Sequence, residues 1–186
     1  MRIIAGNARG RTFDAPKGMD TRPTLDRVRE NVFNILQMKV RGAKVLDLFS
    51  GSGAMAFEAI SRGAEAAVLV DCDRNAHTVQ KQNALKLHLS GQCTILHCDW
   101  KMALQQLAGR GERFGVVFLD PPYAMHDMTP VLEALSAVIN DDAVIVLEHE
   151  AKTFPSTPDG FELYDSRKYG VAGVSFFRKW QTKEAE

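Results

Sequence analysis

Hydrophobic and polar residues follow a pattern that predicts repeated strand and helix units after residue 42. Short apolar runs rich in Val, Ile, Leu and Phe have the length of buried strands, and stretches with helical periodicity separate them. The predicted strands are Lys44–Phe49, Ala67–Asp71, Thr94–Cys98, Val116–Asp120 and Ala143–Glu148, and the predicted helices cover residues 53–62, 74–89, 100–109 and 127–139. This alternation indicates an α/β protein with a parallel sheet and helices on both faces.

The end of the chain departs from this alternation. Two strand-like runs, Phe161–Tyr169 and Val174–Trp180, are separated only by residues 170–173, which are few enough for a hairpin. The pattern therefore predicts a doubly wound, mostly parallel, seven-stranded Rossmann-like sheet that ends in an antiparallel hairpin. A pure dinucleotide-binding fold would continue with another parallel unit.

A smaller extension precedes the sheet. Arg2–Ala5 and Arg11–Phe13 flank a Gly-containing turn and predict a small β-hairpin. A helix is predicted over Leu25–Met38, with Thr24 as its N-cap and Asp26 in its first turn. The predicted organisation is a basic N-terminal hairpin and helix, a main domain and a polar tail, at residues 1–41, 42–180 and 181–186.

Length and composition fit one soluble α/β domain of 186 residues, 45% of them hydrophobic. The absence of an 18-residue apolar run and of a signal-peptide pattern argues against membrane insertion. Cys72, Cys93 and Cys98 are odd in number and lack metal-ligand spacing, and the histidines are scattered. We therefore expect a cytoplasmic protein, acting as a monomer and holding no metal.

The net charge of zero hides an asymmetry. Residues 1–45 contain ten Lys and Arg against four Asp and Glu, whereas the remainder contains 13 basic and 19 acidic residues. A basic segment on an acidic body attracts a polyanion locally, and Arg suits phosphate contacts. An alternative is that some of these arginines pair with acidic groups of the body. The candidate RNA-binding residues are Arg2, Arg9, Arg11, Arg22, Arg27 and Arg29.

The tetrapeptide Asp120-Pro121-Pro122-Tyr123 comes directly after the apolar run Phe114–Leu119. Two prolines end a strand abruptly, so the carboxylate and the ring lie at the C-terminal edge of the sheet, where ligands bind. The motif resembles the one by which amino-methyltransferases hold an exocyclic amine. That resemblance implies that Asp120 and the Pro121 carbonyl accept the two amine hydrogens while Tyr123 stacks on the base. The alternative is a strand-terminating turn in which the Asp caps the next segment.

A glycine turn, residues 47–53, follows the first predicted strand and opens a helix. Gly51 and Gly53 permit a tight turn and close approach of a ligand. Gly51–Ala56 satisfies G-x-G-x-x-[G/A], so this turn alone does not separate a nicotinamide cofactor from S-adenosylmethionine. Asp71 ends the second strand 20 residues after Gly51, where a carboxylate can accept both ribose hydroxyls. Asp73 is its rival.

The third predicted strand ends at Asp99 and Trp100, which can contact an adenine amino group and an adenine ring. Helix capping by Asp99 and core packing by Trp100 are the alternatives. The candidate cofactor-binding residues are Asp47, Phe49, Ser50, Gly51, Gly53, Asp71, Cys72, Asp99 and Trp100.

Taken together, residues 43–123 resemble a class I S-adenosylmethionine-dependent methyltransferase of the amino-group type. Motifs at residues 2–11, 22–36 and 58–64 extend the resemblance to the bacterial 16S ribosomal RNA guanine-N2 methyltransferases, the RsmD family. It implies S-adenosyl-L-methionine as cofactor and 16S ribosomal RNA as partner, in a 30S subunit or an assembly intermediate. Residues 54–57 depart from the Gly-Leu-containing helix start expected in that family.

Two other functions stay open. A methyltransferase could act on another amine, such as DNA adenine or a protein glutamine. A nicotinamide-dependent oxidoreductase would explain Gly51–Ala56 and Asp71 but not residues 120–123 or the closing hairpin. Glu148-His149-Glu150 is interpreted as a polar cluster at a strand edge, and Lys168-Tyr169-Gly170 is a further candidate for shaping the pocket.

Overall fold

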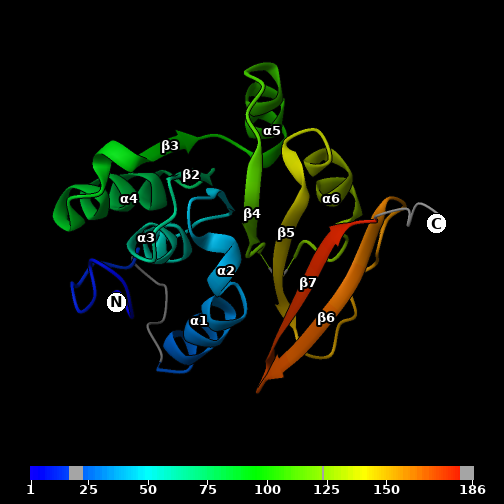
Figure 1. Cartoon of the computed structure of the whole chain (residues 1–186), viewed down its shortest axis with the longest axis horizontal. Coiled ribbons are helices and arrows are strands. Elements are labelled where there is room, and N and C mark those ends of the chain that lie inside the picture. Colours follow the sequence, from blue (N-terminus) through cyan, green and yellow to red (C-terminus); the bar gives the residue numbers. More distant parts are fainter. Residues whose placement is uncertain (17–22, 123, 181–186) are drawn as a thin grey trace.

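The computed structural model describes residues 1–16, 23–122 and 124–180. Its strands are β1 (Lys44–Leu48), β2 (Ala66–Asp71), β3 (Cys93–His97), β4 (Phe114–Leu119), β5 (Ile139–Glu150), β6 (Phe161–Tyr169) and β7 (Ala172–Lys179). They form one sheet in the order β3-β2-β1-β4-β5-β7-β6 (Figure 1). The first five strands pair in parallel, and β7 pairs antiparallel with both β5 and β6. The predicted doubly wound sheet with a closing hairpin is confirmed.

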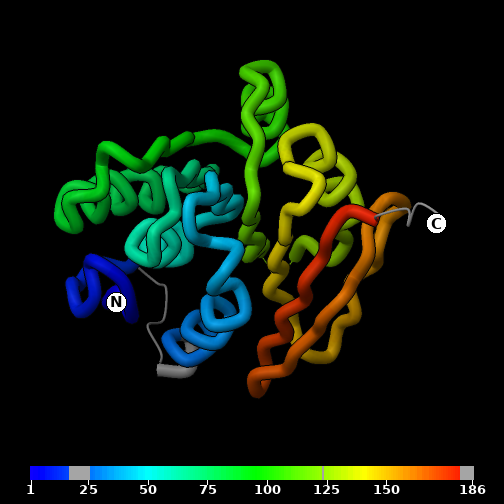
Figure 2. Tube along the Cα trace, in the orientation of Figure 1, coloured from blue at the N-terminus to red at the C-terminus, as the bar shows by residue number. Residues whose placement is uncertain are grey.

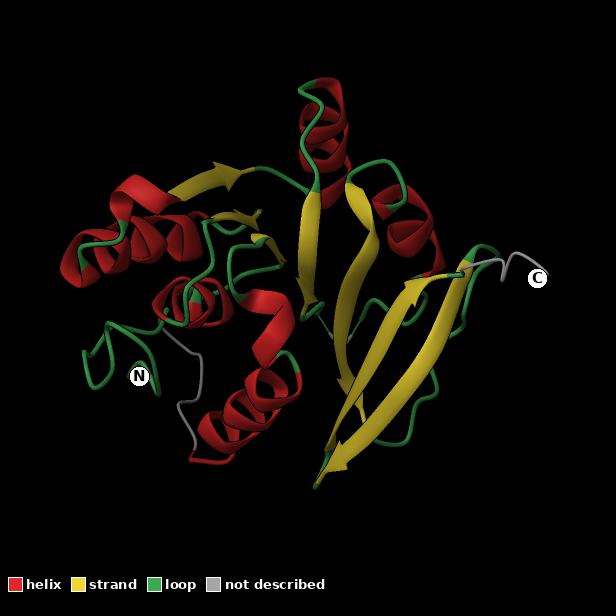
Figure 3. Cartoon of the chain, viewed as in Figure 1, coloured by secondary structure: helices red, strands yellow, loops and turns green. Residues whose placement is uncertain are grey.

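Helices cover both faces of this sheet (Figure 3). They are α1 (Pro23–Ile35), α2 (Gln37–Val40), α3 (Ala54–Ser61), α4 (Arg74–Leu87), α5 (Trp100–Gly109) and α6 (Thr129–Leu135), with a 3-10 turn at Ser90–Gln92. One core joins the N-terminal residues, α1, α3 and α4 to the sheet, and a second core lies beneath α5 and α6. No helix in the described part of the chain is long and apolar enough to span a membrane.

Two predicted helices differ from the expectation: one ends early and the other is divided. The helix predicted over residues 127–139 stops at Leu135, because the Val138 carbonyl accepts a hydrogen bond from Phe114 N at 2.9 Å and Ile139 already pairs with β4. The helix predicted over residues 25–38 is divided at Leu36 into α1 and α2. Asp26 lies in the first turn of α1 as expected, whereas the Thr24 side chain lies outside the described residues.

Residues 1–13 form a minimal hairpin that lies beside α3, as the tube in Figure 2 shows. Ser61 on α3 joins the two: its carbonyl accepts from Asn7 N at 2.8 Å, and its hydroxyl accepts from Ala8 N at 2.9 Å and donates to the Ala5 carbonyl at 2.6 Å. The turn of the hairpin is therefore attached to α3, the helix that begins directly after the glycine turn.

Candidate functional site

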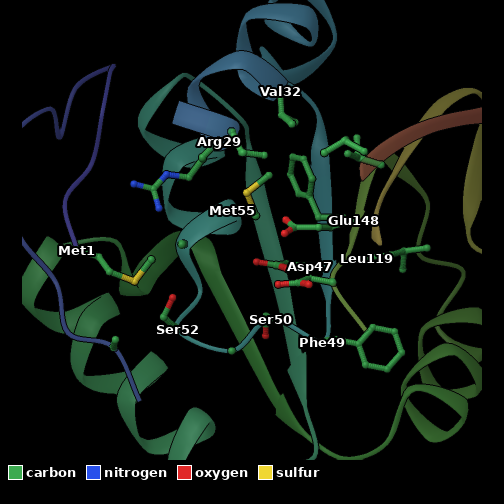
Figure 4. Close-up of a pocket in the computed structure, with 18 residues that line it drawn as sticks. Met1, Arg29, Val32, Asp47, Phe49, Ser50, Ser52, Met55, Leu119 and Glu148 are labelled. Atoms are coloured by element: carbon green, nitrogen blue, oxygen red, sulfur yellow. The ribbon is translucent and has the colours of Figure 1, made fainter. Parts of the chain in front are cut away.

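A cavity of about 870 Å³, open to solvent, lies at the C-terminal ends of β1, β4 and β5, beneath α1 (Figure 4). We call it the first cavity. Its wall combines apolar side chains from α1 and the sheet with the turn that follows β1. Among the residues singled out from the sequence, those that line it include Asp47, Phe49, Ser50, Gly51, Arg29, Asp120 and Glu148.

The glycine turn has a backbone that few other residues could adopt. Gly53 has φ +83°, and a Cβ at this position would lie 2.5 Å from Phe57 Cε2 and 2.7 Å from Leu69 Cδ2. Phe49 has φ 70°, which is uncommon for a residue with a side chain. Such conformations persist only where surrounding contacts hold them and they gather at ligand sites, so the turn has the character of a binding loop.

Two fully buried amides of α4 hold this turn in place. Gln80 Nε2 donates to Ser50 Oγ at 2.9 Å and to the Gly51 carbonyl at 2.8 Å. Asn83 Nδ2 donates to the Ser52 carbonyl at 3.1 Å. Sequence reasoning missed both residues. Their signal is an amide pair three positions apart on the face of a predicted helix that also carries Ala84 and Leu87.

Asp71 lies beside the glycine turn, at the end of β2. One of its oxygens accepts from Gly51 N at 2.8 Å and the other from Asp73 N at 2.9 Å, and each retains a lone pair for a ligand. Asp73, the alternative candidate for the ribose hydroxyls, caps α4 by accepting from Ala76 N at 2.8 Å. Of the two carboxylates, Asp71 is therefore the one directed at the turn.

Cys72, Asp99 and Trp100 lie outside the first cavity, farther along the same sheet edge. Asp99 caps α5, since one of its oxygens accepts from Met102 N at 3.0 Å, while the side chain stays exposed. Trp100 is half-buried against the second core. The capping and packing alternatives are thus present, and an adenine contact stays a prediction for this edge.

Three carboxyl groups line the first cavity, those of Asp47, Asp120 and Glu148. Burial raises the pKa of Asp47 well above its ordinary value, and the charges of Asp120 and Asp71 add to the effect. Desolvation by the cavity walls raises the pKa of Asp120 to about 6, although that side chain is exposed to the opening. Burial, followed by the charge of Asp120, raises the pKa of Glu148 to about 7. A ligand with positive charge would complement this cluster.

A second cavity, of about 520 Å³, adjoins the first on the side of the β4–α6 connection and contains Pro121 and Pro122 in its wall. Among the described residues, Asp120 and Glu148 alone line both cavities. They therefore mark the junction through which a group bound in one cavity would reach a group bound in the other. Tyr123 lies outside the described residues.

Arg29 is not part of an exposed arm, and this corrects the expectation from the sequence. It is 4% exposed, and its Nη2 donates to the Arg2 carbonyl at 2.7 Å and to Asp26 Oδ1 at 3.0 Å. Its Nε lies 4.0 Å from Glu58 Oε2 and has no hydrogen-bond partner in the described structure. Burial makes Arg29 a cavity-wall residue that joins α1 to the N-terminal hairpin.

The other arginines of the basic segment differ in their surroundings. Arg2, Arg9, Arg11 and Arg27 are exposed, so they stay available for a surface contact. Arg11 Nη1 donates to the Leu87 carbonyl at 2.8 Å, which fixes part of its side chain against α4. Arg22 lies outside the described residues.

A family model described as conserved hypothetical protein 95 matches residues 1–178. The chain belongs to this family, the RsmD family. Members of similar length include ribosomal RNA small subunit methyltransferase D of Escherichia coli (strain K12), 34% identical over 100% of this chain and 91% of the relative. The Haemophilus influenzae protein of the same name is 30% identical over 96% of this chain and 93% of the relative.

A solved structure of a hypothetical protein from Thermus thermophilus shares the whole RsmD-family fold. Its TM-score is 0.80, with 31% identity over 95% of this chain and 98% of that chain. The resemblance found in the sequence is thereby confirmed for the family and for the fold.

Proposed function

We propose that this chain transfers a methyl group from S-adenosylmethionine to the exocyclic N2 amine of a guanine in small-subunit ribosomal RNA. The observation that carries the proposal is the junction of the two cavities at Asp120, the first residue of the Asp-Pro-Pro motif. The names of the relatives support ribosomal RNA as the substrate. Residues 120–123 imply an exocyclic amine, and the choice of guanine N2 rests on the wider resemblance to the RsmD family.

The first cavity fits the cofactor in shape and charge. S-adenosylmethionine supplies an electrophilic methyl group on a cationic sulfonium when bound. The glycine turn at Ser50–Ser52 provides close backbone approach, and Asp71 provides a carboxylate beside that turn. Asp47, Asp120 and Glu148 provide the negative potential that a sulfonium and an ammonium group require.

Asp120 and Pro121 act on the amine by orienting it. An aryl amine is a poor nucleophile because its lone pair is delocalised into the ring. If the Asp120 carboxylate and the Pro121 carbonyl accept hydrogen bonds from the two N–H groups, the lone pair is directed across the junction into the first cavity. Positioning of this kind can supply on the order of 7–11 kcal/mol in well-aligned systems.

The same geometry provides for the proton. As the N–C bond forms and the S–C bond breaks, the amine becomes positively charged and acidic, and it must lose one proton. Asp120, with a pKa of about 6, is a better proton acceptor than an ordinary Asp and faces water through the cavity mouth. It can therefore take the proton late and release it to solvent.

RNA reaches the site only if the target base leaves its stack or is already unpaired. The second cavity, lined in part by Pro121, Pro122 and Met125, is where such a base would enter. The exposed arginines of residues 1–41 are proposed to contact phosphates around it. The substrate is proposed to be 16S RNA in a 30S subunit or an assembly intermediate.

The test is methyl transfer to 30S particles and to naked 16S RNA, both from cells that lack this protein. Digestion to nucleosides and mass spectrometry should reveal N2-methylguanosine. Asp120→Asn should abolish transfer while calorimetry shows unchanged affinity for S-adenosylhomocysteine. Methylation of DNA adenine or a protein glutamine instead, or near-normal turnover by Asp120→Asn, would refute the proposal.

A further inference from the structure

Glu148 contributes negative charge to the first cavity, but the reaction described above gives it no contact with the base. It lies near the C-terminal end of β5, where the preceding residue Leu147 pairs with Leu119 of β4, directly before Asp120. It lines both cavities, and Figure 4 shows its side chain directed into the first. The reactive amine of a base must therefore pass beside Glu148 as well as Asp120.

The carboxylate of Glu148 is free to accept from a ligand. Burial and the charge of Asp120 raise its pKa, with no hydrogen bond or cation from the described residues contributing. Its neighbour His149 differs, because its Nδ1 and Nε2 lie 2.8 Å from the Glu150 carbonyl and from Ser175 Oγ, respectively. A base that displaces water from the half-buried Glu148 must therefore supply a donor in its place.

Guanine supplies more donors at this edge than the other bases do. Its N1–H lies next to the N2 amine, so the edge presents three hydrogens side by side. Adenine presents an amine next to N1, which is an acceptor, and cytosine presents an amine next to N3, likewise an acceptor. The junction offers three acceptors, the carboxylates of Asp120 and Glu148 and the carbonyl of Pro121. These can pair with the three hydrogens of guanine. With adenine or cytosine, one acceptor would face the lone pair of a ring nitrogen instead.

We propose that Glu148 selects guanine by accepting a hydrogen bond from its N1–H, while Asp120 and Pro121 hold the N2 amine. This assignment rests on the proposed function and names the feature of the base that the site reads. A carboxylate that accepts from a ring N–H rejects a ring nitrogen lone pair, because the two acceptors repel and both lose water.

The experiment compares two RNA substrates that differ only in the edge of the target base. A small-subunit RNA fragment carries either guanosine or 2,6-diaminopurine riboside at the mapped methylation position. Both bases have the N2 amine, but diaminopurine has a lone pair at N1. At a pH well above the Glu148 pKa of about 7, where this carboxylate can only accept, wild-type protein should methylate guanosine about 10- to 100-fold faster, the discrimination expected for one well-made base contact. Glu148→Gln can accept from guanine N1–H through its carbonyl oxygen or donate its amide N–H to N1 of diaminopurine, so it should methylate the two substrates at similar rates.

Two further variants make the result decisive. Glu148→Ala should bring the two rates close together, because it neither accepts nor donates. Glu150→Gln is the matched control, since Glu150 is exposed, lies two residues farther along β5 and lines only the second cavity, and it should keep the wild-type preference. Affinity for S-adenosylhomocysteine and thermal melting should be measured on every variant to show that each is folded.

The outcomes separate the inference from the function beneath it. If Glu148→Gln and Glu148→Ala slow both substrates by one factor, with the preference unchanged, Glu148 does not read the base and the inference is overturned. If wild-type protein forms no N2-methylguanosine in the guanosine fragment, in naked 16S RNA or in 30S particles, the proposed function itself fails, whatever the variants do.

Discussion

Gly6 and Gly10 offer a matched pair of substitutions for testing how the N-terminal hairpin is attached. Both have nearly the same backbone, with φ +84° and +81°, so Ala at either position costs roughly 1–2 kcal/mol of left-handed strain. Only Gly6 is close to another element. A Cβ there would overlap the backbone carbonyl of Ser61, whereas a Cβ at Gly10 meets nothing within 4 Å.

The additional loss in Gly6→Ala comes from the contacts that must separate. Asn7 N donates to the Ser61 carbonyl, Ala8 N donates to Ser61 Oγ, and that hydroxyl donates to the Ala5 carbonyl. Three hydrogen bonds at about 0.5–1.5 kcal/mol each amount to roughly 1.5–4.5 kcal/mol. Gly6→Ala should therefore lower the free energy of unfolding by that much more than Gly10→Ala does.

Urea denaturation of both variants without ligand measures this difference. Because Met1 and Ala15 line the first cavity, detachment of the hairpin should also weaken binding of S-adenosylhomocysteine in Gly6→Ala and leave Gly10→Ala like wild type. Equal destabilisation of the two variants, or a change in affinity shared by both, would refute the reasoning, since only the contact with α3 distinguishes them.

Three more variants test the site. Asp47→Asn should stabilise the ligand-free protein near pH 8. Burial raises the pKa of Asp47 in the folded protein, so ionisation of this group in the unfolded chain above about pH 3.9 lowers the stability of the wild type by up to about 1.4 kcal/mol per pH unit. An unchanged melting temperature at pH 8, or an equal gain at pH 4, would contradict this. Asp71→Ala should weaken S-adenosylmethionine binding by roughly 1.5–3 kcal/mol in calorimetry, and unchanged affinity would remove Asp71 from the cofactor site. Replacing the exposed Arg9 and Arg27 with Ala should weaken RNA binding and make its salt dependence shallower at an unchanged melting temperature, whereas an unchanged salt slope would exclude phosphate contacts by these residues.

The sheet could be predicted because its signal is local. Apolar runs of strand length, a glycine turn and a four-residue hairpin connection each report their own structure, and parallel order then follows from the alternation. The ends of α6 and α1 could not be predicted, since they depend on pairing of Ile139 with β4 and on a break at Leu36. Such contacts join residues far apart in the sequence.

The site was predictable where a motif carries its own geometry and not where burial decides. Gly53 and Asp71 lie at the turn as expected. Arg29 reads as one more basic residue until the fold buries it against Glu58 and Asp26. Glu148 reads as a strand-edge polar residue, and only the shape of the two cavities shows that it lies at their junction.

The amides of α4 have a consequence for the energetics of ligand binding. Asn83 accepts from Asp14 N at 2.9 Å and donates to the Asp14 carbonyl at 2.8 Å and to the Ser52 carbonyl at 3.1 Å, so one side chain joins the N-terminal segment to the glycine turn. Gln80 fixes the preceding part of that turn. The loop is therefore ordered before any ligand arrives, and its conformational entropy is lost during folding. Binding free energy that would otherwise order the loop is retained as affinity.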